Sequence, residues 1–446
     1  MLNKLISFLM ETSYQDLTPE IIKQAKRCII DWTGVALAGA AHQTVSIMRG
    51  TVETLGGNPQ ASIFGTPIKT SVVNAALVNG TMSHVLDFDD THLEALMHPS
   101  APLVPALLAY GEWKGINGKD FLLSYLLGFE VETRISMAMG ESHYAAGWHA
   151  TATMGRFGAA AGVGKQARLG RNEMVHALGL AGTQASGIRN VFGTMTKSFH
   201  PGIAAANGLL SVLLAQEGYT SAPDILETGK GLGNILSDDY NPQRGLKGLG
   251  QTHTILGTSF KPFASCLYTH PTIDAVIALR NQNTIAPDAV DTIRCGVSKF
   301  CMDAANQKNP QTGLSAKFSV SYCAALAMLN GRAGDDLFQD TEIQNPATLD
   351  LMGRVGVEAV PELKDSEAEV TVILKNGQKL KHHTVHALGS PENPLSDRQL
   401  EEKAKTLLEP VFDGKKADTI IDRLWGLEEV ENISEITNLL SNQWSA

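Results

Sequence analysis

The chain lacks the features that mark disulfide-rich, membrane and nucleic-acid-binding proteins. Its five cysteines, at positions 28, 266, 295, 301 and 323, are scattered and form no C-x-x-C pair, which argues against a disulfide framework, a structural zinc site and an iron–sulfur cluster. No run of 18 or more apolar residues occurs, so we expect no membrane partner. The formal net charge of −10 argues against nucleic acid, because binding phosphates needs a concentrated basic patch.

We also expect no secretory signal. The first residues carry an early lysine, Lys4, and a short apolar stretch, but no small-residue cleavage site follows them. We therefore expect a cytoplasmic protein with reduced thiols. At 446 residues, with 43% apolar and 18% charged residues, the chain is long enough for two domains of unequal size.

Helical patterns fill the first half of the chain. Thr18-Pro19-Glu20 is a typical helix start, and apolar residues then recur at helical spacing as far as Trp32. A second helix is expected after Asn117, and small-residue helices over 152–169 and 174–186. By contrast, 193–202 is bounded by glycines, contains Pro201, and is predicted to be a loop.

Strand patterns appear only after residue 258. Residues 290–297 and 368–374 are typical of strands, and Asn376-Gly377 predicts a hairpin to a return strand over 379–385. A helix is expected over 318–330, and two more helices follow the turn-rich 389–394. The predicted class is mainly α with a smaller α+β domain: a large all-helical domain (1–257), an α+β lid (258–390), and C-terminal helices (391–446) that rejoin the helical domain.

The segment Asp87-Phe88-Asp89-Asp90-Thr91-His92, closed by His98-Pro99-Ser100, is the densest cluster of chemically active side chains. Buried charges are costly unless they are paired or used. If the segment were helical, Asp87, Asp90 and Thr91 would share one face. Three interpretations compete: a metal site, a phosphatase nucleophile, and a metal-free acid/base site.

Sequence context argues against the metal-site and phosphatase interpretations. Three acids resemble magnesium or calcium ligands, but the calcium-loop pattern with its distal glutamate is absent. Asp87-x-Asp89-x-Thr91 fits the nucleophile loop of haloacid-dehalogenase-type phosphatases. That loop should follow a buried parallel strand, whereas residues 73–80 upstream are typical of a helix. We expect no metal and no cofactor.

Three further clusters could complete an acid/base site. His149 lies in Gly147-Trp148-His149, Lys197 in the segment 193–202, and Lys261 in Lys261-Pro262-Phe263-Ala264-Ser265-Cys266, which runs on to His270. Each has a structural alternative: a lone histidine is most often a hydrogen-bonded core residue, lysines are by default exposed, and Cys266 alone is a small buried hydrophobe. Lys261 falls at the predicted domain junction, where small-ligand clefts are common.

In this order the clusters resemble the MmgE/PrpD family. The matching stretches are 83–91 with His98-Pro99-Ser100, Gly147-Trp148-His149, Thr196-Lys197, Lys261-Pro262 and the linker 391–394. The resemblance implies a helical domain with an α+β lid, a homodimer, and no required metal. It also implies a pocket of six residues: Asp87, Thr91, His98, His149, Lys197 and Lys261. Tyr322 corresponds to a tyrosine near that pocket, and Cys266 to a position without cysteine in the animal decarboxylase.

The resemblance predicts the class of reaction. Members include 2-methylcitrate dehydratase, cis-aconitate decarboxylase and iminodisuccinate epimerase. We therefore expect a metal-independent lyase for a small di- or tricarboxylic acid, with cis-aconitate decarboxylation as the first hypothesis and the dehydratase and epimerase reactions as alternatives. His98, His149, Lys197, Lys261 and Asp87 are the expected catalytic residues. The expected substrate-binding residues are Thr91, Tyr322, His270 and Cys266. From other classes, a phosphatase and a non-enzymatic helical dimer stay open.

Overall fold

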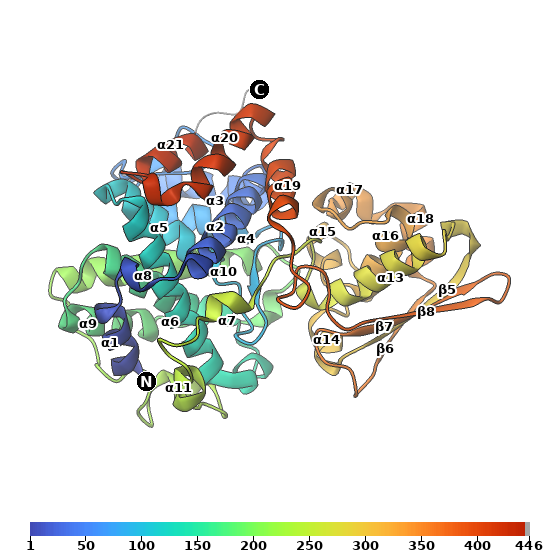
Figure 1. The fold of residues 1–446 in the computed structure, drawn as a ribbon, viewed down its shortest axis with the longest axis horizontal. Coiled ribbons are helices and arrows are strands. Elements are labelled where there is room, and N and C mark those ends of the chain that lie inside the picture. Colours follow the sequence, from blue (N-terminus) through green and yellow to red (C-terminus); the bar gives the residue numbers. More distant parts are fainter. Residues whose placement is uncertain (442–446) are drawn as a thin grey trace.

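The computed structural model describes residues 1–441, which form a large helical lobe and a smaller lobe with a sheet (Figure 1). The helices of the first lobe are α1 (Leu2–Glu11), α2 (Pro19–Gly39), α3 (Gln43–Leu55), α4 (Val72–His84), α5 (Ser100–Lys114), α6 (Gly118–Ala145), α7 (Ala150–Thr153), α8 (Gly155–Gln166), α9 (Arg171–Thr183), α10 (Thr196–Gln216), α11 (Leu232–Leu236) and α12 (Pro242–Leu246). This arrangement confirms the predicted class, mainly α with a smaller α+β part.

The smaller lobe packs helices on a four-stranded sheet. Its strands are β5 (Val290–Val297), β6 (Val355–Ala359), β7 (Ala368–Leu374) and β8 (Lys379–Thr384), in the order β6-β5-β7-β8. The pairs β5–β7 and β7–β8 are antiparallel, and β5–β6 is parallel. Its helices are α13 (His270–Gln282), α14 (Lys299–Ala304), α15 (Gly313–Ala316), α16 (Val320–Asn330), α17 (Asp340–Ile343) and α18 (Pro346–Met352).

The chain returns to the first lobe at its C-terminal end. The helices there are α19 (Asp397–Leu408), α20 (Gly414–Trp425) and α21 (Ser434–Ser441). Helix α19 packs along α2, and α21 packs against α5; in Figure 1 these red helices lie beside the blue N-terminal ones. This packing supports the domain division at 257 and 390, which we keep as a proposal.

Local signals placed many elements correctly. Thr18 caps α2 by accepting a hydrogen bond from the Ile21 amide, and Asn117 caps α6 through the Asp120 amide. Strands β5 and β7 have the predicted bounds, and β8 is one residue shorter than predicted. Two short strands, β3 (Thr91–His92) and β4 (Thr258–Ser259), pair antiparallel. They join the first chemical cluster to the segment that leads into Lys261.

The loop prediction for 193–202 is wrong from Thr196 onward, because α10 begins there and includes Pro201. The proline removes one amide donor, but tight packing against α4 offsets that loss. A Cβ atom added to Gly80 of α4 would lie 2.8 Å from the Gly202 Cα atom. Helix α10 is long and apolar enough for a membrane span, yet 67% of its apolar window is buried in the fold.

Replacing Gly202 by alanine is therefore expected to destabilise the protein by about 1–3 kcal/mol, because the new methyl group would collide with the Leu77 carbonyl and Thr81. Gly50, in α3, has nothing within 4 Å of an added Cβ. Gly50→Ala is the matched control and should stabilise by about 0.5–1 kcal/mol. Urea denaturation of both variants checks this. A Gly202→Ala protein as stable as the parent would contradict the close helix contact.

Candidate active site

The loop that carries Asp87 is held by its backbone carbonyls. Helix α4 ends at His84, and the chain then turns through residues 85–90 with Asp87 in the left-handed region (φ 50°). Three consecutive carbonyl groups each accept a hydrogen bond from a different lysine: Leu86 from Lys317 at 2.6 Å, Asp87 from Lys261 at 2.8 Å, and Phe88 from Lys403 at 2.8 Å. The helical alternative for this segment is thus wrong, because the lysines bind carbonyls that a helix would use internally.

The Asp87 carboxylate joins two lysines from different parts of the chain. Its Oδ1 atom lies 2.8 Å from Lys197 Nζ and 3.0 Å from Lys261 Nζ. Burial pushes the pKa of Asp87 upward, but the two ammonium groups outweigh burial and hold that pKa well below its ordinary value. Asp87 is therefore a permanent anion that positions two cations.

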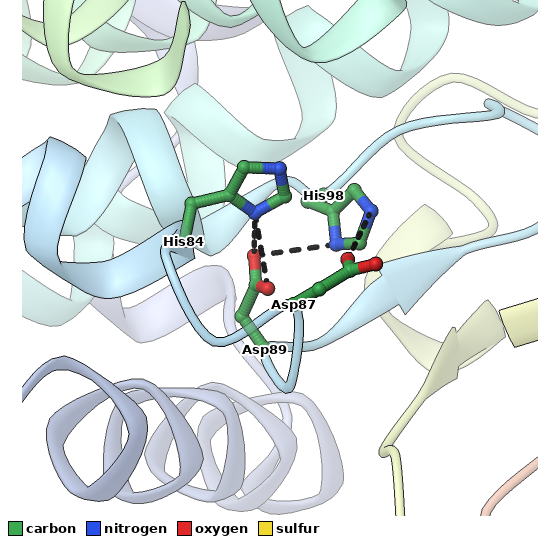
Figure 2. A group of neighbouring side chains, drawn as sticks. All are labelled: His84, Asp87, Asp89 and His98. Carbon is green, nitrogen blue, oxygen red and sulfur yellow. Dashed lines mark hydrogen bonds and ion pairs between the residues drawn. The ribbon is translucent and has the colours of Figure 1, made fainter. Parts of the chain in front are cut away.

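A second carboxylate, Asp89, lies between two imidazole rings (Figure 2). His84 Nδ1 is 2.8 Å from Asp89 Oδ2, and His98 Nδ1 is 3.2 Å from the same oxygen. Burial lowers the pKa of His84 to about 4 against the opposing charge of Asp89. It also lowers the pKa of His98, which Asp89 opposes in the same way. Asp89 itself stays ionised because the two imidazoles outweigh its burial and keep its pKa well below the ordinary value.

A contact with the Asp90 backbone carbonyl determines which nitrogen of His98 carries a proton. His98 Nδ1 lies 3.1 Å from the Asp90 carbonyl oxygen, which can only accept, so Nδ1 carries a proton. The other nitrogen, Nε2, lies 3.8 Å from Asp87 Oδ1 on the cavity side. In neutral His98 this Nε2 has a free lone pair, and in the imidazolium it carries a transferable proton.

His149 is the N-cap residue of α7, and its side chain contacts that of His200. Its Nδ1 lies 2.9 Å from His200 Nδ1, and both side chains are buried. Burial, followed by the charges of His200 and Lys197, keeps the pKa of His149 well below its ordinary value. His149 is consequently neutral at physiological pH.

Seven of the nine predicted site residues line one cavity between the lobes: Asp87, Thr91, His98, His149, Lys197, Lys261 and Cys266. Phe192 and Phe318 form an apolar wall, with Lys197 Nζ at 5.2 Å from the centre of each ring. The cavity volume of about 40 Å³ holds only a few water molecules.

The remaining two predicted residues lie outside this lining. Tyr322 is fully buried, and its hydroxyl donates to the Leu337 carbonyl at 3.1 Å. His270 is also fully buried and packs on Phe263, with Nε2 at 3.2 Å from the Ser265 carbonyl. Both side chains satisfy neighbours in the smaller lobe, so in this structure they support the cavity rather than face it.

Cys266 lines the cavity, but as a neutral thiol. Burial raises its pKa to about 11, with the nearby Asp87 charge acting in the same direction. A thiol is a good nucleophile only as the thiolate. Cys266 is thus suited to shaping the cavity and unsuited to covalent catalysis.

Several cavity residues were missed from the sequence. Tyr144 and Tyr268 face the cavity from α6 and from the segment before α13, and no pattern distinguished either tyrosine from a core residue. His84 lies in the matching stretch 83–91 but was not a predicted site residue; it is outside the cavity lining and contacts Asp89. Its spacing of five residues from Asp89 could have suggested the pairing, because a turn after a helix brings such residues together.

Four side chains of this site, His84, Asp87, Asp89 and His98, place ligand atoms within 4.8 Å of one another, which is a possible metal-binding cluster. The donor set does not suit a cation, however. Asp87 Oδ1 already accepts from both Lys197 and Lys261, and a metal ion bound to that oxygen would be repelled by two adjacent ammonium groups. The geometry favours an anionic ligand.

Removing Lys403 should show how much the loop depends on its lysines. Lys403 Nζ lies 2.6 Å from Asp31 Oδ1, and both side chains are buried. Lys403→Met would leave Asp31 buried and unpaired, so we expect a loss of about 3–5 kcal/mol in unfolding free energy.

Lys405→Met, on the exposed face of the same helix, is the matched control and should leave the unfolding midpoint unchanged. Chemical denaturation of both variants is the measurement. If Lys403→Met unfolds at the same denaturant concentration as the parent, the contacts of Lys403 with Asp31 and the Phe88 carbonyl contribute little to stability.

Comparison with known proteins places this geometry in a family. The MmgE/PrpD N-terminal domain matches residues 3–245, and the MmgE/PrpD C-terminal domain matches residues 263–427. Similar curated proteins are cis-aconitate decarboxylases. The human protein is 28% identical over 95% of this chain and 91% of its own length, and the mouse protein 27% over 95% and 90%. The Aspergillus terreus protein is 27% identical over 96% of this chain and 93% of its own length. The chain belongs to the MmgE/PrpD family.

Proposed function

We propose that this protein is a metal-independent lyase for a small polycarboxylic acid, with cis-aconitate as the first substrate to test. The observation that carries the proposal is the convergence of the Lys197 and Lys261 ammonium groups with the imidazoles of His98 and His149 on one cavity. Relatives named cis-aconitate decarboxylase, similar over nearly the whole chain, support the same substrate class.

The lysines would bind the substrate carboxylates. An ammonium group has three N–H donors, and within residues 1–441 Lys197 donates only to Asp87. Two donors are left for an incoming carboxylate. Lys261 spends two of its donors on Asp87 and keeps one. Because both groups are buried, their attraction for an anion is stronger than it would be in water.

Decarboxylation needs a proton donor beside the carbon atom that becomes protonated. The bond from the carbon skeleton to the departing carboxylate breaks, and its electron pair stays on the skeleton, where the neighbouring double bond and carboxylate delocalise it. His98, as imidazolium, would then transfer its Nε2 proton to carbon. The balance is a tricarboxylate trianion plus one proton giving a dicarboxylate dianion plus carbon dioxide, and His98 regains its proton from solvent.

The other members of this acid/base set have supporting roles. Asp89 would stabilise the His98 imidazolium, as the carboxylate partner of a catalytic histidine does. Thr91 and the Lys197 ammonium line the same cavity and would contact the substrate. A dehydratase or an epimerase would use an acid and a base on this cavity, so a substrate panel distinguishes these alternatives. A homodimer and a cytoplasmic location stay predictions.

The phosphatase alternative is excluded by its context. Helix α4, and not a strand, precedes Asp87, and the Asp87 carboxylate is held by two lysines. A phosphatase nucleophile loop of that type follows a buried parallel strand.

The direct test assays the EDTA-treated protein with cis-aconitate, 2-methylcitrate and citrate. We expect carbon dioxide release from cis-aconitate. Lys197→Met should lower kcat/KM at least about 100-fold, because it removes a donor aimed at developing negative charge. Lys364→Met, with 80% of its side chain exposed, is the control and should be unaffected.

Other outcomes would each be informative. Water release from 2-methylcitrate favours the dehydratase, and solvent deuterium exchange without net conversion favours the epimerase. Activity lost with EDTA and restored by magnesium supports the metal interpretation. No turnover and no exchange with any of these acids contradicts the proposed lyase, and intact biological function of Lys197→Met would favour a non-enzymatic role.

The pH dependence follows from His98. Burial lowers the pKa of His98 below 6.5, and the charge and hydrogen bond of Asp89 partly restore it. A reaction that needs the imidazolium in the free enzyme loses kcat/KM as pH rises through that pKa. Asp89→Asn removes the supporting charge, so the decline should move to lower pH.

The measurement is a kcat/KM profile between about pH 4.5 and 8.5, bracketing the ordinary histidine pKa. Asp418→Asn, an exposed carboxylate paired with Lys405 on the surface, is the control and should keep the parent profile. A decline that stays in place in Asp89→Asn would show that His98 is not the titrating acid.

A further inference from the structure

A second histidine, His200, contacts His149 but does not line the cavity. His149 Nδ1 and His200 Nδ1 are 2.9 Å apart, which is a hydrogen bond between two imidazole rings. His200 is in α10, three residues after Lys197, and 6% of its surface is exposed. His149 lines the cavity, whereas His200 is absent from the lining.

This contact constrains the protons on both rings. Of two imidazole nitrogens at hydrogen-bond distance, one must carry a hydrogen and the other must present a lone pair. If His200 Nδ1 donates, His149 Nδ1 is the acceptor, and a neutral His149 then has its hydrogen on Nε2. The two rings therefore adopt opposite tautomers, and the state of His200 dictates what His149 presents to the cavity.

Burial, with basic groups close by, keeps this pair neutral. Lys197, His84 and His98 face His149, while Lys197, His84 and Arg156 lie near His200, and all of these groups are cationic or basic. Burial, reinforced by these neighbours, lowers the pKa of His200 to about 4. A second proton on the pair is therefore unfavourable at physiological pH.

The His149 ring itself is fixed by its packing. Phe192 meets it edge-on at 4.9 Å between ring centres, and the His149 amide donates to the Gly187 carbonyl at 3.0 Å. The ring cannot adjust freely to a ligand, so its hydrogen placement matters. A cavity with two ammonium groups attracts carboxylate, and a carboxylate accepts hydrogen bonds but cannot donate them.

We infer that His200 is a positioning residue for His149: its Nδ1–H donates to His149 Nδ1, so that a neutral His149 presents Nε2–H to a substrate carboxylate. This assignment rests on the proposed function, since it needs an anionic substrate. It also gives His98 and His149 different roles, with His98 moving a proton and His149 holding the substrate.

The kinetic test compares two variants of the same residue. His200→Leu removes the donor, and we expect kcat to fall at least about tenfold while KM changes less than kcat. In His200→Asn, the amide nitrogen donates to the same Nδ1, so kcat should return to within about threefold of the parent. His176→Leu, in α9 and outside the cavity lining, serves as the control. A His200→Asn protein as impaired as His200→Leu would overturn the inference.

The second readout needs no turnover. Protein labelled with ¹⁵N-histidine and bound to tricarballylate, a saturated tricarboxylate, should show His149 as the neutral Nε2–H tautomer and His200 as the Nδ1–H tautomer. Assignment comes from spectra of His149→Asn and His200→Asn. A cationic His149, or one with its hydrogen on Nδ1, overturns the inference even in an active enzyme.

The two proposals fail in different ways. If the parent protein turns over none of the polycarboxylates, the proposed function fails before any His200 variant is examined. If it is active and His200→Leu retains full kcat, the proposed function stands and the role of His200 is wrong.

Discussion

The structure depends on the binding of one loop's carbonyl oxygens by lysine side chains from distant segments. Leu86, Asp87 and Phe88 present successive carbonyls to Lys317, Lys261 and Lys403. These lysines come from the smaller lobe, from the junction and from α19. Charged hydrogen bonds are about twice as strong as neutral ones, and they hold Asp87 in a left-handed conformation that is otherwise unfavourable for a residue with a side chain. The loop thereby becomes a fixed part of the site.

The same interaction determines the charge of the cavity. Two ammonium groups share the single Asp87 carboxylate, and Asp89 lies against the imidazoles of His84 and His98. Around Asp87 this leaves a local excess of one positive charge beside the apolar wall of Phe192 and Phe318. Burying such an excess costs stability unless an anion completes it. The arrangement therefore trades stability of the empty site for attraction to a carboxylate.

Elements with local signals were predicted well. Thr18 and Asn117 mark helix starts through their own side-chain caps, and the alternation in 368–374 reveals a half-buried strand. The loop prediction for 193–202 is wrong because proline and glycine usually end helices. Here the contact of Gly202 with α4 favours the helix. Local helix propensity carries no information about packing against α4.

The sequence indicated which side chains lie together better than how they are arranged. The resemblance implied six side chains that line the cavity, and Cys266 lines it as well, but Tyr322 and His270 turn toward the smaller lobe. Contacts such as Lys403 with Phe88 join residues 315 positions apart, and no spacing rule reaches that far. The pairing of His149 with His200 is unpredictable from sequence for the same reason, because it requires the relative placement of α7 and α10.

The position of Lys403 in the chain has a consequence for biosynthesis. Helix α19 is synthesised after the first 396 residues, and its lysine is one of the groups that hold the Asp87 loop. A chain that ends before α19 lacks the cation that binds both the Phe88 carbonyl and the Asp31 carboxylate. During translation the Asp87 loop can therefore acquire its complete set of lysine contacts only after most of the chain has been made.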